Sequence, residues 1–167
     1  MNMLKSINKI LSIAALVIVM ASCSSSKNAV AVATRDDVKG TWILDKITYE
    51  GLATSEKLTL NLLDEGSDLC LTGSTWVLPN NGNGTYTIAA NQSGCMPGQK
   101  NIVWSYRKEG SQPVFQFKKM QGGVKAKDVV EGYRFKILSA SANNMLLQSE
   151  ITYQGKPIYI NYSFSKS

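Results

Sequence analysis

Short runs of alternating apolar and polar residues, separated by Gly, Asn, Pro and Ser, occupy most of the chain after residue 38. Such alternation is typical of antiparallel β-strands that bury one face and expose the other. We count about nine runs, near residues 40–49, 57–63, 73–78, 84–90, 101–108, 113–119, 130–138, 144–153 and 156–165. No stretch in this region has the period of an amphipathic helix, so the pattern predicts an all-β domain.

The clearest alternation indicates that the strands curve around one core. Every second residue from Ile158 to Phe164 is apolar or aromatic, and the same holds from Tyr133 to Ile137. Consecutive hairpins with one buried face can close on themselves, which removes the exposed edges that an open sheet leaves. The fold class that we expect is a single antiparallel up-and-down β-barrel of about 8–9 strands.

The first 22 residues follow the pattern of a signal peptide. Lys5 and Lys9 form the positively charged start, and residues 10–20 form an apolar run of eleven residues. This run is shorter than the roughly 20 apolar residues that a membrane-spanning helix needs. We therefore expect residues 1–22 to be removed during export.

The end of this segment, Met20-Ala21-Ser22-Cys23, resembles a bacterial lipobox, in which the cysteine becomes the acylated first residue. The resemblance implies lipidation at Cys23 and attachment to a membrane through the N-terminal lipid. The alternative is an ordinary secretory signal with Cys23 as a bystander thiol. Ser24 resembles the residue that retains lipoproteins in the outer membrane, so we expect a lipid-anchored protein of the cell envelope, at the outer membrane and facing the periplasm.

Chain length favours one domain after export. Cleavage after residue 22 leaves 145 of the 167 residues, which suits one continuous core. Residues 23–37 are small and polar beyond Cys23 and lack sustained periodicity, so they predict a flexible tether. The expected organisation is a signal peptide at 1–22, the lipidated cysteine and tether at 23–37, and the barrel domain at 38–167.

Cysteine usage predicts one disulfide. With Cys23 assigned to lipid, Cys70 and Cys95 remain as an even pair in an oxidising compartment. A bridge that closes a loop of about 25 residues stabilises a protein by roughly 3 kcal/mol. The alternative is a pair of free buried thiols.

Gly40-Thr41-Trp42, at the head of the first run, resembles the G-x-W signature of lipocalins. The chain from Val38 to Lys166 resembles the lipocalin-like domains of small lipoproteins from Gram-negative bacteria. Recurring features of those domains have counterparts here in Trp42, in Cys70 with Cys95, and in Tyr162-Ser163-Phe164. Lipocalins place an arginine from a late strand over the tryptophan, whereas the last strands here offer only Lys156 and Lys166. The resemblance implies a barrel that binds a ligand.

Composition removes several classes of activity. The chain has no His, which excludes Ser-His-Asp and Cys-His catalysis and leaves zinc without its usual ligand set. Residues 64–68, Asp-Glu-Gly-Ser-Asp, form the one acidic cluster and are either a calcium-binding loop or a solvated turn next to the disulfide. They lack the pattern of a dedicated calcium loop, and no pair of carboxylates stands out for catalysis. We expect a protein that is not an enzyme and has no cofactor or metal.

Net charge gives no support to a nucleic-acid partner. The chain carries +6, and its densest basic stretch, residues 118–127, has no motif for entering a nucleic-acid groove. We therefore expect no nucleic-acid binding.

Aromatic residues are the remaining candidates for a binding site. Ten of them lie at strand positions: Trp76, Tyr86, Trp104, Tyr106, Phe115, Phe117, Tyr133, Phe135, Tyr162 and Phe164. A barrel of about eight strands has an interior just wide enough either for side chains or for one small ligand. Our leading hypothesis is a small apolar ligand bound inside the barrel by Trp104, Tyr106 and Phe117, with Trp76 near the mouth. The alternative is a non-enzymatic envelope scaffold or interaction lipoprotein with a filled barrel and an envelope protein as its partner.

Overall fold

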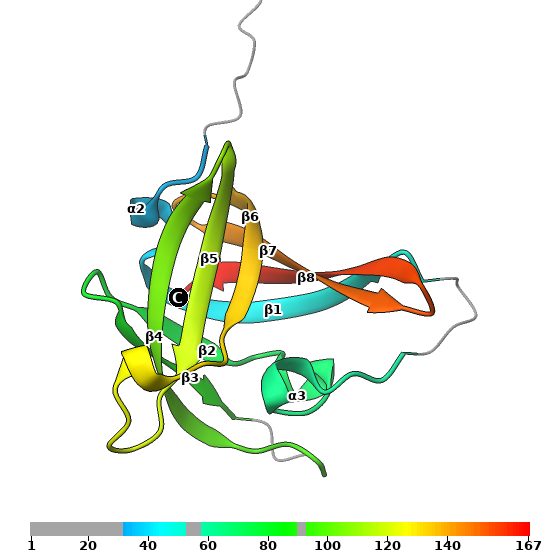
Figure 1. The fold of residues 1–167 in the computed structure, drawn as a ribbon, viewed down its shortest axis with the longest axis horizontal. Helices are drawn as coiled ribbons and strands as arrows, with labels where there is room; N and C mark the ends of the chain where they lie inside the picture. The colour runs from blue at the N-terminus through cyan, green and yellow to red at the C-terminus, as the bar shows by residue number, and fades with distance from the viewer. Residues whose placement is uncertain (1–31, 53–57, 90–92) are drawn as a thin grey trace, which may run out of the picture. The chain divides into compact units, whose positions relative to one another are not determined.

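The computed structural model describes residues 32–52, 58–89 and 93–167, and these residues form an eight-stranded β-barrel (Figure 1). The strands are β1 Gly40–Glu50, β2 Thr75–Leu78, β3 Asn83–Ile88, β4 Gly98–Glu109, β5 Gln112–Lys119, β6 Tyr133–Ala140, β7 Asn144–Tyr153 and β8 Lys156–Lys166. The helices are α2 Arg35–Val38, the 3-10 helix η1 Leu62–Asp64, α3 Asp68–Leu71 and the 3-10 helix η2 Ala126–Asp128. In the part of the chain that the structure describes, none of these helices has the length and apolar character needed to cross a membrane.

Strand pairing follows the order of the sequence. Every strand pairs antiparallel with the next one, and β1 pairs with β8 to close the barrel. The closing seam runs from Trp42 opposite Lys166 to Glu50 opposite Tyr159. In Figure 1 the strands β4, β5 and β6 cross the direction of β1, β7 and β8. The predicted fold class is confirmed, with eight strands at the lower end of the expected range.

A bulge in β1 explains why its burial does not alternate strictly. Leu44 and Ile47 are both buried although two residues separate them, whereas strict alternation would send one of them outward. The pairing with β8 shifts register between Leu44 and Lys46. The extra residue re-aims the strand, so that both side chains reach the core.

The predicted strand at 57–63 is wrong for residues 58–63, because residues 58–61 are irregular and residues 62–63 belong to η1. Leu62 and Leu63 are adjacent and both buried, which an extended strand cannot achieve against one core. Leu63 and Asp64 instead have positive φ angles of 52° and 54°. This turn sends the chain toward α3, and the two leucines become part of the core cluster.

Ordered structure begins before Val38, the start that the sequence predicts for the barrel domain. Ala33 is buried, and so is Val38, the last residue of α2. The carboxylate of Asp37 accepts hydrogen bonds from the backbone N–H and the hydroxyl of Thr34, at 2.8 Å and 2.7 Å. These bonds lower the pKa of Asp37 and fix the start of the helix. Residues 33–37, expected in the tether, therefore pack on the barrel.

Candidate functional site

The four side chains predicted to bind a ligand lie on strands that enclose the interior. Trp76, Trp104 and Phe117 are buried, and Tyr106 is partly buried against the core. Trp76 and Phe117 meet edge to face, with ring centroids 5.4 Å apart. Trp104 instead contacts Phe115, with centroids 6.0 Å apart. Trp76, expected near the mouth, has only 3% of its surface exposed and is surrounded by three other rings.

Nine aromatic rings form one connected network inside the barrel: Trp76, Tyr86, Trp104, Phe115, Phe117, Tyr133, Phe135, Tyr162 and Phe164. Neighbouring ring centroids lie between 4.6 Å and 6.1 Å apart, the range of favourable stacked and edge-to-face contacts. Phe117 contacts five of the other rings. The centre of the barrel is thus filled by the protein's own side chains.

The segment around α2 closes one end of the barrel. The guanidinium of Arg35 lies 4.1 Å from the ring centre of Trp104. The hydroxyl of Tyr106 donates a 2.7 Å hydrogen bond to the carbonyl of Ala33. Two of the four predicted residues therefore hold α2 in place, with a cation–π contact and a hydrogen bond in addition to packing.

Lys166 of β8 lies over the ring of Trp42, and the last strands contain no arginine that could take this place. Its ammonium lies 4.0 Å from the ring centre of Trp42 and donates a 2.7 Å hydrogen bond to the carbonyl of Lys39. Gly40 makes this possible, since a Cβ atom there would lie 2.3 Å from the ammonium nitrogen. Burial and the nearby charge of Lys39 lower the pKa of Lys166. Gly40 and Trp42 therefore leave room for a cation over the tryptophan ring, and we call this position the cation site.

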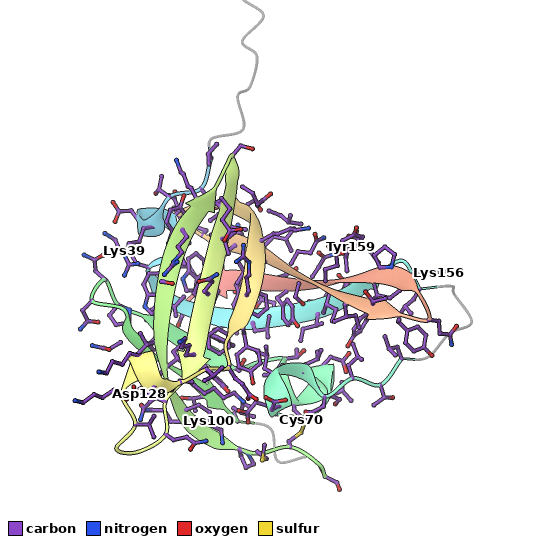
Figure 2. All side chains as sticks on the ribbon, in the orientation of Figure 1. Lys39, Cys70, Lys100, Asp128, Lys156 and Tyr159 are labelled. Atoms are coloured by element: carbon purple, nitrogen blue, oxygen red, sulfur yellow. A yellow bond between two sulfur atoms is a disulfide. The ribbon has the colours of Figure 1, made fainter. Side chains whose placement is uncertain are left out.

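A buried carboxylate lies at the other end, where β4 begins and β5 finishes. Glu65 is 2% exposed. Its Oε1 atom accepts a 2.5 Å hydrogen bond from the hydroxyl of Tyr86 and a 2.6 Å bond from the ammonium of Lys119. The ammonium of Lys100 is 3.8 Å from Oε2, which has no hydrogen-bond partner among the described residues. Figure 2 shows Lys100 on the α3 side of the ribbon and Lys39 near α2.

Further contacts tie the loop of Glu65 to the strands. The hydroxyl of Tyr133 donates to Asp64, and the ammonium of Lys119 donates to the carbonyl of Leu63. Burial first, and then the interactions with the two acids, raise the pKa values of Tyr86 and Tyr133 above 10.0. These contacts hold the loop over the end of the barrel.

The expected solvated turn at residues 64–68 is wrong for Glu65, which enters the barrel. Among the described residues, no three His, Cys, Asp or Glu side chains are grouped to hold a metal ion. Sequence reasoning missed Glu65, Lys100 and Lys119 as a cluster. The available signal was a single acidic run together with lysines at the ends of two apolar strands.

A hollow of about 500 Å³ lies on the outside of the barrel, over β4, β5 and β6. Outward-facing residues of these strands form its floor, and the loop between β5 and β6 contributes to its wall. Its lining includes Val103, Arg107, Gln116, Lys118, Val130 and Arg134. A second hollow of about 490 Å³ lies beside the loop of Glu65.

The predicted disulfide is confirmed. Cys70 in α3 and Cys95 are bonded, across a sequence separation of 25 residues. Gly66 lies against the bridge, because a Cβ atom there would be 2.7 Å from the sulfur of Cys70. The bridge thus fastens α3 and the loop that carries Glu65 to the segment before β4. The predicted lipidation site, Cys23, lies outside the described residues.

Comparisons with known proteins give one structural likeness. No protein-family model and no curated protein matches the chain. The crystal structure of a lipocalin-like protein from Bacteroides uniformis ATCC 8492 is similar, with 17% sequence identity and a TM-score of 0.43. The likeness covers 78% of this chain and 99% of that protein. The strand pairing within this chain defines its architecture as a closed barrel.

Proposed function

We propose that this chain is a non-enzymatic, lipid-anchored protein of the cell envelope that works by binding, with its binding surfaces on the outside of a filled barrel. The partner is an envelope component rather than a molecule enclosed by the strands. The lack of His in the sequence supports a role other than hydrolysis. The disulfide supports an oxidising compartment such as the periplasm.

The packing around Phe117 carries this proposal. Its ring is 1% exposed and touches five other rings, so a ligand at the centre would have to displace them. Both ends are covered as well, by α2 and by the loop of Glu65. Close-packed interiors resist such displacement, since each displaced ring loses its dispersion contacts.

The lumen is tested with benzene, which is small enough for a cavity the size of one side chain. We expect the wild-type protein to bind no benzene inside the barrel, and Phe117→Ala to bind it while losing about 3–5 kcal/mol of unfolding free energy. Leu138→Ala, at an outward position that is 41% exposed, is the matched control and should change neither property.

The competing hypothesis is a carrier for a small apolar ligand, and the inward aromatic side chains favour it. A carrier would bind an apolar probe saturably in the lumen, and Trp104→Leu would weaken that binding more than it weakens folding. This result in the wild-type protein would reject the filled barrel.

Anchoring is tested separately at Cys23. The sequence pattern predicts that Cys23→Ala prevents acylation and leaves a protein that no longer partitions with membranes. Buried acyl chains contribute about 0.8 kcal/mol per methylene, so the loss of attachment should be nearly complete. Intact mass of the wild-type protein supplies the control, and an unmodified Cys23 thiol in mature protein would contradict the proposal.

A further inference from the structure

We propose that the hollow over β4, β5 and β6 binds a small amphipathic anion, with an apolar body and one acidic head, of the fatty-acid type. This site rests on the proposed function because its ligand binds outside the lumen. The hollow gives that function a location and its ligand a chemical class.

The floor of the hollow comes from the outer face of the sheet. Val103 of β4 is opposite Lys118 of β5, and Ser105 is opposite Gln116 in the next row. Because side chains alternate along a strand, these residues point away from the aromatic network. The hollow therefore lies on the outer face of the sheet, and Trp104, Phe117 and Tyr133 of the ring network also border it.

The wall is a loop that a lysine holds in place. The ammonium of Lys118 donates to the carbonyls of Ala126 and Val129, at 3.3 Å and 2.5 Å. Gly132 lets the loop approach, since a Cβ atom there would meet the stem of Lys118 at 3.3 Å. Val130, in the same loop, lines the hollow but keeps 95% of its surface exposed. The loop is thus anchored by polar bonds, while its apolar side chain is left uncovered.

Charge on the lining has one sign. Four lining residues are basic and none is acidic. Arg134 pairs with Glu109, and Lys118 is engaged with the loop. Arg107 and Lys127 form no ion pair with any described residue. Two unpaired cations beside an apolar surface favour a ligand that carries a negative head.

The size and polarity of the hollow match such a ligand. Its volume of about 500 Å³ lies within the range of small-molecule sites. Val103, Ala126 and Val130 offer apolar contact to the body, and covering Val130 would remove its exposed surface from water. Arg107 and Lys127 are placed to meet the head.

The test is a fluorescence titration of the purified protein with anilinonaphthalene sulfonate, whose rings carry one sulfonate. We expect saturable binding that decanoate displaces. Val130→Asp should weaken the affinity for the dye about tenfold, and Arg107→Gln should weaken it several-fold. The affinity for neutral phenylnaphthylamine should change by no more than about twofold in Arg107→Gln. Leu138→Asp, an equally apolar-to-acid change on β6 outside the hollow, should stay within about twofold of the wild type.

Unfolding midpoints of every variant are measured alongside, because this dye also binds loosened proteins. Unchanged affinity in both Val130→Asp and Arg107→Gln would overturn the inference, as would an equal loss in Leu138→Asp. Binding that survives Val130→Asp but is lost in Trp76→Leu, a residue of the ring network that does not line the hollow, would place the ligand in the lumen, which rejects the proposed function as well. Binding that is absent in the wild type rejects the hollow and leaves the filled barrel standing.

Discussion

Glu65→Gln tests whether the buried carboxylate fastens the loop to the barrel. The substitution keeps the shape of the side chain but removes the charge that accepts bonds from Tyr86 and Lys119. A hydrogen bond to a charged group contributes about 1.5–3 kcal/mol and a neutral one about 0.5–1.5 kcal/mol. The side chains of Lys100 and Lys119 are 28% and 26% exposed, so water can partly replace the carboxylate that they lose. We therefore expect a loss of about 2–3 kcal/mol, below the 3–5 kcal/mol of a fully buried broken pair.

The assay is urea unfolding of Glu65→Gln, Lys119→Met and the double variant, followed by circular dichroism. The double-mutant cycle should give a coupling of about 1–2 kcal/mol, because the two groups touch at 2.6 Å. Glu131→Gln, at an exposed position, is the control and should stay within about 0.5 kcal/mol of the wild type. A coupling near zero, or a loss in Glu65→Gln no larger than in the control, would refute the reasoning.

Three further predictions concern pH, the disulfide and the cation site of Lys166 over Trp42. Burial and the contact with Glu65 raise the pKa of Tyr86 in the folded protein, so Tyr86 keeps its proton there above pH 10 while the tyrosines of the unfolded chain ionise. The free energy of unfolding should therefore be at its full value below the unfolded pKa of 10.0, and should fall by up to about 1.4 kcal/mol per pH unit above that pH. Unfolding curves with tyrosinate absorbance check this, and flat stability above pH 10 would contradict it. Alkylation without reductant should label neither Cys70 nor Cys95, and replacing both by Ser should remove about 3 kcal/mol; ready labelling in the native protein would argue against the bridge. Gly40 has a φ of 128°, so Gly40→Ala should lower the free energy of unfolding in urea by about 1–3 kcal/mol and displace Lys166. A free energy of unfolding close to that of the wild type would contradict this prediction.

Sequence patterns predicted the features that depend on local periodicity. The alternation of Phe117 with Gln116 and Lys118 placed its ring on the inner face, because the side-chain period of a strand is two wherever the strand lies. The pairing of Cys70 with Cys95 followed from counting cysteines after export. Neither prediction required knowledge of which strands meet in space.

Features built from distant segments were not predictable in this way. Glu65 meets Tyr86 and Lys119, which are 21 and 54 residues further along the chain. A run of acidic residues is usually solvated, and only the closed barrel brings these partners to it. Lys166 over Trp42 is a second case, since the first and last strands must pair before the contact exists.

The seam between β1 and β8 also determines when the fold can be completed. During synthesis β1 emerges before the other strands, and its partner on one side, residues 156–166, emerges after the other seven. Until then the outer edge of β1 has unpaired backbone groups, which are a template for aggregation. Contacts between segments so far apart in sequence also make folding slow. A chain that lacks β8 therefore carries two open edges, at β1 and β7, and these edges close only when residues 156–166 pair with both strands.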